Sequence, residues 1–426
     1  MSRDLPEWVS PETIAVRGGL MRSGFFETSE ALYLNSGYVY DSAEAAERAF
    51  TGEDERFVYT RYGNPTVEMF TERLRQIEGT EAAFATASGM AAVFVALGAL
   101  LKNGDRLVAA RSLFGSCFVI CNEILPAWGV ETVFVDGEDL TQWEEALSVP
   151  TTAVFFETPS NPMQTLVDVR RVSELAHAAG ARVVLDNVFA TPLLQRGLDM
   201  GADVIVYSGT KHIDGQGRVM GGAVMGTEEY ITGPVRELMR HTGPALSPFN
   251  AWVMLKGLET MKLRVDQSVA TALKIAEFLD ADPRVARAIY PFLPSHPQYE
   301  LAKAQMAGGG TVITFELGAA DGGGSSSSPD RSPSSPDRSM GSPDRSLSSV
   351  EGKQRAFEVL NRLQVIDISN NLGDAKSLIT HPATTTHRAM GPEGRAAIGL
   401  TDAMVRLSVG LENADDLIRD LDQALG

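Results

Sequence analysis

The chain has 426 residues, a hydrophobic fraction of 44% and a formal net charge of −18, from 37 Lys and Arg against 55 Asp and Glu. This length and ordinary globular composition predict two or three domains, or one large α/β domain with an appendage. The acidic balance argues against nucleic acid or an anionic membrane as a partner, and the two cysteines exclude a disulfide framework, which favours a reducing, cytoplasmic compartment.

Residues 1–63 predict an N-terminal arm with little core of its own, because glycines interrupt them and no strong apolar periodicity runs through them. The opening MSRDLPEW does not resemble a secretory signal, since acidic residues and a proline come before any apolar run. A helix is predicted next, with Asn64 as its N-cap, Pro65 as its first residue and Gly79 as its end.

The uncharged stretch 82–101 is long enough to span a bilayer. It contains Thr86, Ser88, Gly89 and several alanines, and only its second half is strongly apolar. We therefore predict a short strand, a turn and a buried helix here, because nothing else in the chain supports the membrane alternative.

Short β-rich apolar runs then alternate with helical patterns over about residues 64–250. The runs are 82–86, 106–110, 131–135, 153–157, 182–186, 203–207 and 222–225. This alternation predicts a large α/β domain with a seven-stranded, mainly parallel sheet covered on both faces. Ligands of such sheets bind beyond the carboxyl ends of the strands, so polar residues at those points are candidates for a site.

A smaller C-terminal α+β domain is predicted over residues 251–426. Its helical texture at 251–279 is followed by strand-like runs at 310–317 and 405–409 and by a final helix from Ala414. An insertion at 318–349 carries three copies of SPDRS, and its lack of apolar residues predicts a solvated, disordered loop. A regulated docking or phosphorylation segment stays open as an alternative for this insertion.

Two consecutive predicted strands end in groups that suit pyridoxal phosphate. Asp186 ends the run RVVLD, and Ser208, Thr210 and Lys211 follow the run DVIVY. The lysine would hold the cofactor covalently, the carboxylate would keep the pyridine nitrogen protonated, and the hydroxyls would bind phosphate. Taken singly, Asp186 could instead cap the following helix and Lys211 could be an ordinary surface residue.

Two further segments can supply phosphate ligands. The motif SGMAA places Ser88, Gly89 and Met90 at the start of an apolar helix, where backbone N–H groups bind phosphate, although a tight strand–helix turn would look the same. Tyr59 and Arg61, in YTRYGNPT, lie on the arm and could close a phosphate site of a neighbouring subunit. An ordinary surface arginine is the alternative.

The motifs YTRYGNPT, SGMAA, ETPSNP, LDN, SGTKH and VRLSVGLE together resemble the trans-sulfuration, or Cys/Met metabolism, family of fold-type-I pyridoxal phosphate enzymes. The resemblance implies this cofactor, small-molecule substrates and a homotetramer of active-site dimers. It implies that Tyr59 and Arg61 reach the partner's cofactor phosphate and that Arg406 binds the substrate α-carboxylate. By the same resemblance, the phosphate ligands are Ser88, Gly89, Met90, Ser208 and Thr210.

The chain departs from the family pattern between its second and third motifs. Phe114, in SLFGS, stands where the family usually has the tyrosine that stacks on the cofactor ring. A phenyl ring can stack but cannot transfer a proton, so Tyr59 or Lys211 is expected to carry proton transfer. Ser116 stands where the γ-lyases have a cysteine, and Cys117 and Cys121 are interpreted as buried thiols rather than catalysts.

The run SNNLGDAKSL, with Asn371, and the string HPATTTH resemble the branch of the family that uses sulfide directly. The branch implies γ-replacement in methionine biosynthesis, in which an O-acyl homoserine and sulfide give L-homocysteine, with Asn371 and Arg406 binding the substrate. We predict the succinyl ester and leave the acetyl ester open. His381 and His387 flank Pro382 at a spacing that does not suit a metal, so no metal is predicted.

Three alternatives to direct sulfhydrylation remain at this point. Two belong to the same family, namely cystathionine γ-synthesis and γ-elimination. The third is a non-catalytic binding protein that keeps the fold and uses the SPDRS copies as its working surface.

Overall fold

The computed structural model of the chain describes residues 5–6, 8–318 and 347–426. Residues 319–346, with all three SPDRS copies, lie outside the described residues, so the predicted disorder of the insertion is not tested. The chain resumes with helix α14 (Ser349–Arg362), whose N-cap Ser348 forms a capping box with Glu351.

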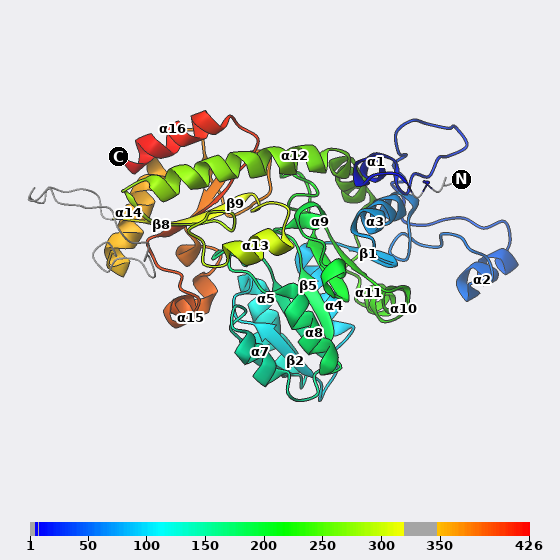
Figure 1. The fold of residues 1–426 in the computed structure, drawn as a ribbon. Helices are drawn as coiled ribbons and strands as arrows, with labels where there is room; N and C mark the ends of the chain where they lie inside the picture. Colours follow the sequence, from blue (N-terminus) through cyan, green and yellow to red (C-terminus); the bar gives the residue numbers. More distant parts are fainter. Residues whose placement is uncertain (1–4, 7, 319–346) are drawn as a thin grey trace, which may run out of the picture.

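The N-terminal arm contains two short helices, α1 (Pro11–Arg17) and α2 (Ala43–Thr51), and Figure 1 shows α2 projecting away from the body of the chain. The arm is attached where the buried Glu30 carboxylate accepts hydrogen bonds from Arg73 and Lys256, each at 2.5 Å. Elsewhere it exposes large apolar side chains, among them Phe25 at 94% and Val39 at 89% exposure. Its own core is therefore small.

Helix α3 (Pro65–Glu78) follows the arm with the predicted boundaries. The Asn64 side chain accepts a hydrogen bond from the Thr66 N–H, and Gly79 ends the helix with a positive φ of 89°. That conformation is one that glycine adopts without steric cost, which explains why the helix ends there.

The large sheet has the predicted seven strands, in the order β1-β7-β6-β5-β4-β2-β3. The strands are β1 (Ala82–Thr86), β2 (Arg106–Ala110), β3 (Glu131–Val135), β4 (Ala153–Glu157), β5 (Arg182–Asp186), β6 (Val204–Ser208) and β7 (Gly222–Gly226). Only β7 runs against the others, since it pairs antiparallel with both β1 and β6 while the remaining pairs are parallel. The prediction of a mainly parallel sheet is confirmed.

The side chains of the strands alternate between the two faces of the sheet, and each face packs into an apolar core. In β2, Val108 and Ala110 belong to one apolar core and Leu107 and Ala109 to the other. Helices α3, α8 (Val169–Ala178) and α12 (Pro248–Ala281) contribute to the first core, and α4 (Gly89–Gly98) and α11 (Arg236–Thr242) to the second. The other helices are α5 (Gly115–Val119), α6 (Leu125–Ala127), α7 (Leu140–Ala146), α9 (Thr191–Leu194), α10 (Glu228–Tyr230), α13 (Tyr299–Gln305) and α15 (Gly391–Ala397).

The uncharged stretch 82–101 folds as predicted, into strand β1, a turn at Ser88 and helix α4. Within the described ranges, no helix has the length and apolarity needed to cross a membrane.

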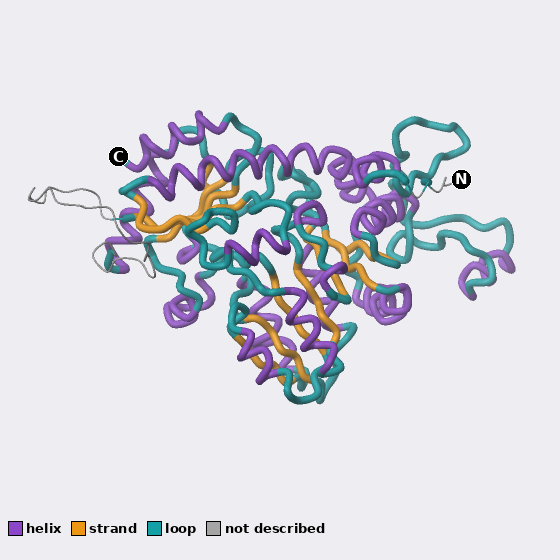
Figure 2. The backbone as a smooth tube through the Cα atoms, viewed as in Figure 1, coloured by secondary structure: helices purple, strands orange, loops and turns teal. Residues whose placement is uncertain are grey.

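The smaller domain is built on a five-stranded sheet in the order β10-β11-β12-β9-β8. Its strands are β8 (Val285–Ile289), β9 (Val312–Leu317), β10 (Asp367–Ile368), β11 (Leu378–Thr380) and β12 (Met404–Ser408). Figure 2 shows the two sheets as separate groups of strands, and the long helix α12 packs against α3 at one end and β8 at the other. Helices α14 and α16 (Ala414–Leu425) complete the core of this domain.

Candidate active site

The predicted site residues of the large domain follow the carboxyl ends of strands that point the same way. Ser88, Gly89 and Met90 follow β1, Phe114 follows β2, Asp186 ends β5, and Ser208, Thr210 and Lys211 end or follow β6. These strand ends meet at one edge of the sheet, so the fold collects these residues on the side where parallel sheets bind ligands.

Lys211 is held by residues of the smaller domain. Its Nζ donates a hydrogen bond to Asn371 Oδ1 at 2.5 Å, and the carbonyl oxygens of Asn370 and Asn371 accept from Arg406 Nη2 at 2.9 and 3.1 Å. Burial, together with the positive charge of Arg406, lowers the pKa of Lys211 from 10.5 to about 8. A substantial fraction of this amine is therefore neutral, and hence nucleophilic, near physiological pH.

This lowered pKa predicts how the apoprotein takes up pyridoxal phosphate. The neutral amine attacks the aldehyde, so the rate of covalent attachment should rise with pH and level off above a midpoint near pH 8. Growth of the visible absorbance after mixing apoprotein with cofactor, followed at pH values on both sides of 8, measures this profile. A midpoint near 10.5, the value for an unperturbed lysine, would contradict it.

Asp186 is a carboxylate without a cationic partner among the described residues. Its Oδ1 accepts a hydrogen bond from the Val188 N–H at 3.1 Å, and no Lys, Arg or His of the described ranges forms an ion pair with it. Burial raises the pKa of Asp186 above its ordinary value, because the charged form is poorly solvated there. A protonated pyridine nitrogen would supply the missing positive charge, so the residue fits the predicted cofactor.

The predicted phosphate ligands lie together where α4 meets β6. Ser88 caps α4 by accepting a hydrogen bond from the Ala91 N–H at 3.1 Å, and a Cβ at position 89 would collide with the side chain of Ser208. Gly89 thus allows the N-terminus of a ten-residue helix to approach the Ser208 hydroxyl closely. The Thr210 hydroxyl accepts a hydrogen bond from the Gly221 N–H at 3.2 Å and is partly engaged.

Phe114 lies on a turn that is fixed on two sides. Its N–H donates to Glu157 Oε2 at 3.1 Å, and a Cβ on the following Gly115 would lie 2.8 Å from the carbonyl oxygen of Thr386. Cys117 and Cys121 are buried behind this turn. Burial raises the pKa of Cys121 to about 12 and also raises the pKa of Cys117 well above its ordinary value, so both side chains remain thiols.

Arg406 projects from β12 and is 1% exposed. Its Nη1 donates to Asn161 Oδ1 at 3.1 Å, and in the described part of the chain no carboxylate pairs with it. Burial lowers the pKa of Arg406 to about 10, so the guanidinium stays charged at neutral pH. A buried, unpaired cation is what a substrate α-carboxylate requires.

Tyr59 and Arg61 lie on the arm, away from the groups above. Arg61 donates a hydrogen bond to the carbonyl oxygen of Arg240, and its guanidinium lies 5.5 Å from the Tyr59 ring and 4.8 Å from the Tyr62 ring. None of these contacts joins either side chain to Lys211. Tyr59 is 41% exposed and accessible from outside the chain.

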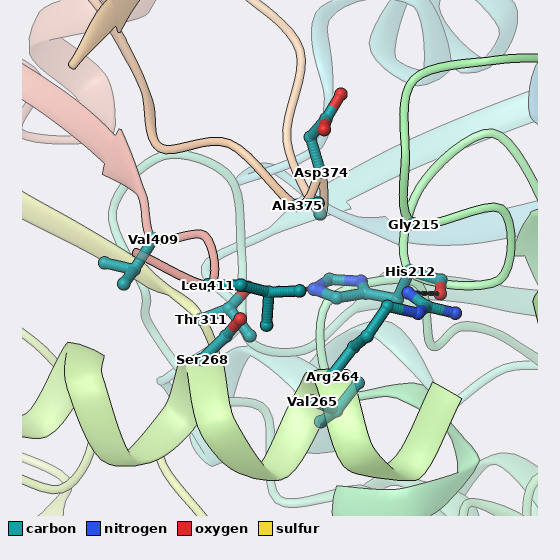
Figure 3. Close-up of a pocket in the computed structure, with 11 residues that line it drawn as sticks. His212, Gly215, Arg264, Val265, Ser268, Thr311, Asp374, Ala375, Val409 and Leu411 are labelled. Atoms are coloured by element: carbon teal, nitrogen blue, oxygen red, sulfur yellow. Dashed lines mark hydrogen bonds between the residues drawn. The ribbon is translucent and has the colours of Figure 1, made fainter. Parts of the chain in front are cut away.

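A cavity of about 10 Å³ lies between α12 and the loops that follow β6, β10 and β12. Figure 3 shows Arg264 extending from α12 against His212, to whose carbonyl oxygen its Nη1 donates at 2.8 Å. His212 Nε2 is 2.8 Å from Thr311 Oγ1. The cavity has room for roughly one water molecule, and His212, the residue after Lys211, forms part of its wall.

Three residues of the site have no role in the predictions from sequence. Glu157 ends β4 beside Asp186, Asn161 bonds Arg406, and His387 Nε2 lies 3.0 Å from the carbonyl oxygen of Asn161. The motif ETPSNP contains the first two. Glu157 could have been identified from the sequence, because it ends the strand that comes before the strand ending at Asp186. His387 could not be linked to Asn161, since 226 positions separate them.

Comparisons with known proteins agree with this geometry. The family model described as Cys/Met metabolism PLP-dependent enzyme matches residues 12–329 and 345–426. An O-succinylhomoserine sulfhydrylase of Mycobacterium tuberculosis is 68% identical over 421 residues, which cover 99% of this chain and 97% of the relative. One of Pseudomonas aeruginosa is 41% identical, covering 97% of this chain and 94% of the relative.

A solved structure links the fold to the cofactor. A Campylobacter jejuni chain described as an O-acetylhomoserine (thiol)-lyase has a TM-score of 0.86 and 29% sequence identity, covers 98% of this chain and 100% of its own, and contains a pyridoxyl-lysine phosphate group. The predicted fold class and cofactor are thereby confirmed. This chain therefore belongs to the Cys/Met metabolism family of pyridoxal-phosphate-dependent enzymes, as its sequence, its fold and the side chains at the edge of its large sheet all indicate.

Proposed function

We propose that this enzyme converts O-succinyl-L-homoserine and sulfide to L-homocysteine and succinate. The observation that carries the proposal is the pairing of Lys211 with Asn371, because it joins the predicted catalytic amine to the SNNLGDAKSL loop that resembles the sulfide-using branch. The high identity to two O-succinylhomoserine sulfhydrylases supports the same substrate.

The side chains of the site suit this reaction. Bound pyridoxal phosphate supplies an aldehyde for the substrate amine and a ring that accepts the electron pair left when the α-proton departs. Arg406 binds the α-carboxylate and orients the substrate. Lys211, with its lowered pKa, takes up the α-proton near neutral pH, and Phe114 offers only a stacking surface. Overall, succinate leaves Cγ and sulfur takes its place, without net oxidation or reduction.

Product analysis tests the proposal. With O-succinylhomoserine and either sulfide or cysteine, we expect homocysteine and succinate from sulfide as the dominant reaction. O-acetylhomoserine, run in parallel, measures the preference for the acyl group. Cystathionine as the main product, or a keto acid and ammonia, would refute the proposal in favour of the other family reactions.

The arm suggests how chains assemble. We propose a homotetramer of active-site dimers in which Tyr59 and Arg61 reach the cofactor phosphate of a neighbouring chain. The exposed apolar side chains of the arm and the outward position of Tyr59 support this assembly.

Two free cysteines and the acidic composition support a cytoplasmic location. The mass in solution and cell fractionation test these two points.

A further inference from the structure

Glu157 is a buried carboxylate whose two oxygens serve different segments. It ends β4, is 6% exposed, and lies next to Asp186 in the parallel register of β4 and β5. Its Oε2 accepts the N–H of Phe114 at 3.1 Å and its Oε1 accepts the N–H of Asn161 at 2.8 Å. No cation of the described ranges lies within ion-pair distance of it.

Each of these two N–H groups belongs to a residue that faces the reaction. Phe114 carries the ring expected to stack on the cofactor. Asn161 Oδ1 accepts from Arg406 Nη1 at 3.1 Å, and the Asn161 carbonyl is held from the smaller domain by His387 Nε2 at 3.0 Å. One carboxylate therefore links the stacking ring to the arginine that holds the substrate.

The placement of Glu157 is unfavourable for stability alone. A carboxylate buried beside a second carboxylate loses hydration and gains repulsion, and both effects raise the pKa of Glu157. Two backbone N–H donors compensate only in part, and an apolar side chain at the end of a buried strand would avoid these penalties. This loss of stability is explained if Glu157 has a role in the active site.

We propose that Glu157 is a positioning residue that fixes Phe114 and, through Asn161, Arg406 in relation to the cofactor ring held at Asp186. Its effect on the cofactor ring requires only that the cofactor binds. Its effect on the substrate rests on the function proposed above.

The test compares three variants with the wild-type holoenzyme. In Glu157→Gln, the side chain keeps one acceptor oxygen, so one of the two N–H groups loses its partner. In Glu157→Asp, the charge remains but the reach to both N–H groups is shorter. Glu78→Gln is the matched control, because Glu78 is 2% exposed, has a pKa that burial raises to about 7, and accepts a hydrogen bond at 2.7 Å from the hydroxyl of Tyr207, which is not a residue of the predicted site.

The readouts are the visible circular dichroism that the protein induces in bound pyridoxal phosphate, the Tm, and kcat and KM with the acyl ester. We expect both Glu157 variants to retain the cofactor, to show a clearly weaker induced signal, and to lose at least roughly tenfold in kcat/KM with KM raised. Glu78→Gln should change Tm but neither the signal nor KM. If Glu157→Gln does not fold, the Asp variant carries the comparison.

Two outcomes would overturn the proposal. One is an induced signal in the Glu157 variants equal to that of Glu78→Gln. The other is a normal Asp variant beside an impaired Gln variant, since charge rather than position would then matter. Failure of the proposed function is distinguishable, because wild-type protein that binds cofactor but makes no homocysteine still yields the dichroism comparison.

Discussion

Lys211→Ala is expected to abolish covalent attachment of pyridoxal phosphate and to lower kcat by roughly 10⁴-fold or more, since it removes both the anchoring amine and the general base. Asn371, its hydrogen-bond partner, has no basic group and cannot replace the amine. Borohydride treatment followed by peptide mapping, together with the visible spectrum, measures the loss.

The matched control is Lys102→Ala, which removes an exposed lysine from the turn before β2. It should keep the spectrum and the rate. A Lys211→Ala protein that still traps cofactor with borohydride on another side chain and turns over normally would show that the assignment of the catalytic amine is wrong.

Asp186→Asn should retain the cofactor but lose about 10²- to 10³-fold in kcat, because a neutral amide no longer holds the pyridine nitrogen protonated and the ring becomes a poorer electron acceptor. The effect should be specific to the cofactor, because Asp186 has no cationic partner within the described residues. The protonated pyridine nitrogen of the bound cofactor would be its partner. The expected signs are an altered pH dependence of the visible band and a kcat that falls far more than KM rises.

Asp203→Asn serves as the control for this change. Asp203 lies at the opposite edge of the sheet, just before β6, where its carboxylate accepts the N–H of Val183 and pairs with Arg182 and His177. Its loss should lower stability without altering the cofactor spectrum. Equal kinetic effects from the two variants would mean that Asp186 acts only through folding.

Much of the large domain could be predicted from local sequence. Five of the seven strands begin and end at the predicted residues, because each is a short, β-rich and mainly apolar run. The ends of those runs also locate Asp186 and Lys211, since parallel strands bring their carboxyl ends to one edge.

The smaller domain was harder to predict, for a physical reason. Strand β8 carries Arg287 between apolar residues and β11 has three residues, so neither shows a strong alternating pattern. Their pairing depends on partners far along the chain. The same holds for the bond between Lys211 and Asn371, which lie 160 positions apart, and for Arg406 and Asn161, which lie 245 apart. Only the folded chain brings these pairs together.

The two buried cysteines have a consequence for an enzyme that handles hydrosulfide. Hydrosulfide itself does not modify a thiolate, but polysulfides, the products of its oxidation, transfer sulfur to an accessible thiolate and form a persulfide there. Cys117 and Cys121 are protonated and shielded behind the Phe114 turn, so the chain offers these reagents no ready point of attack there. Oxidised products of the co-substrate therefore find no accessible thiolate at these two positions.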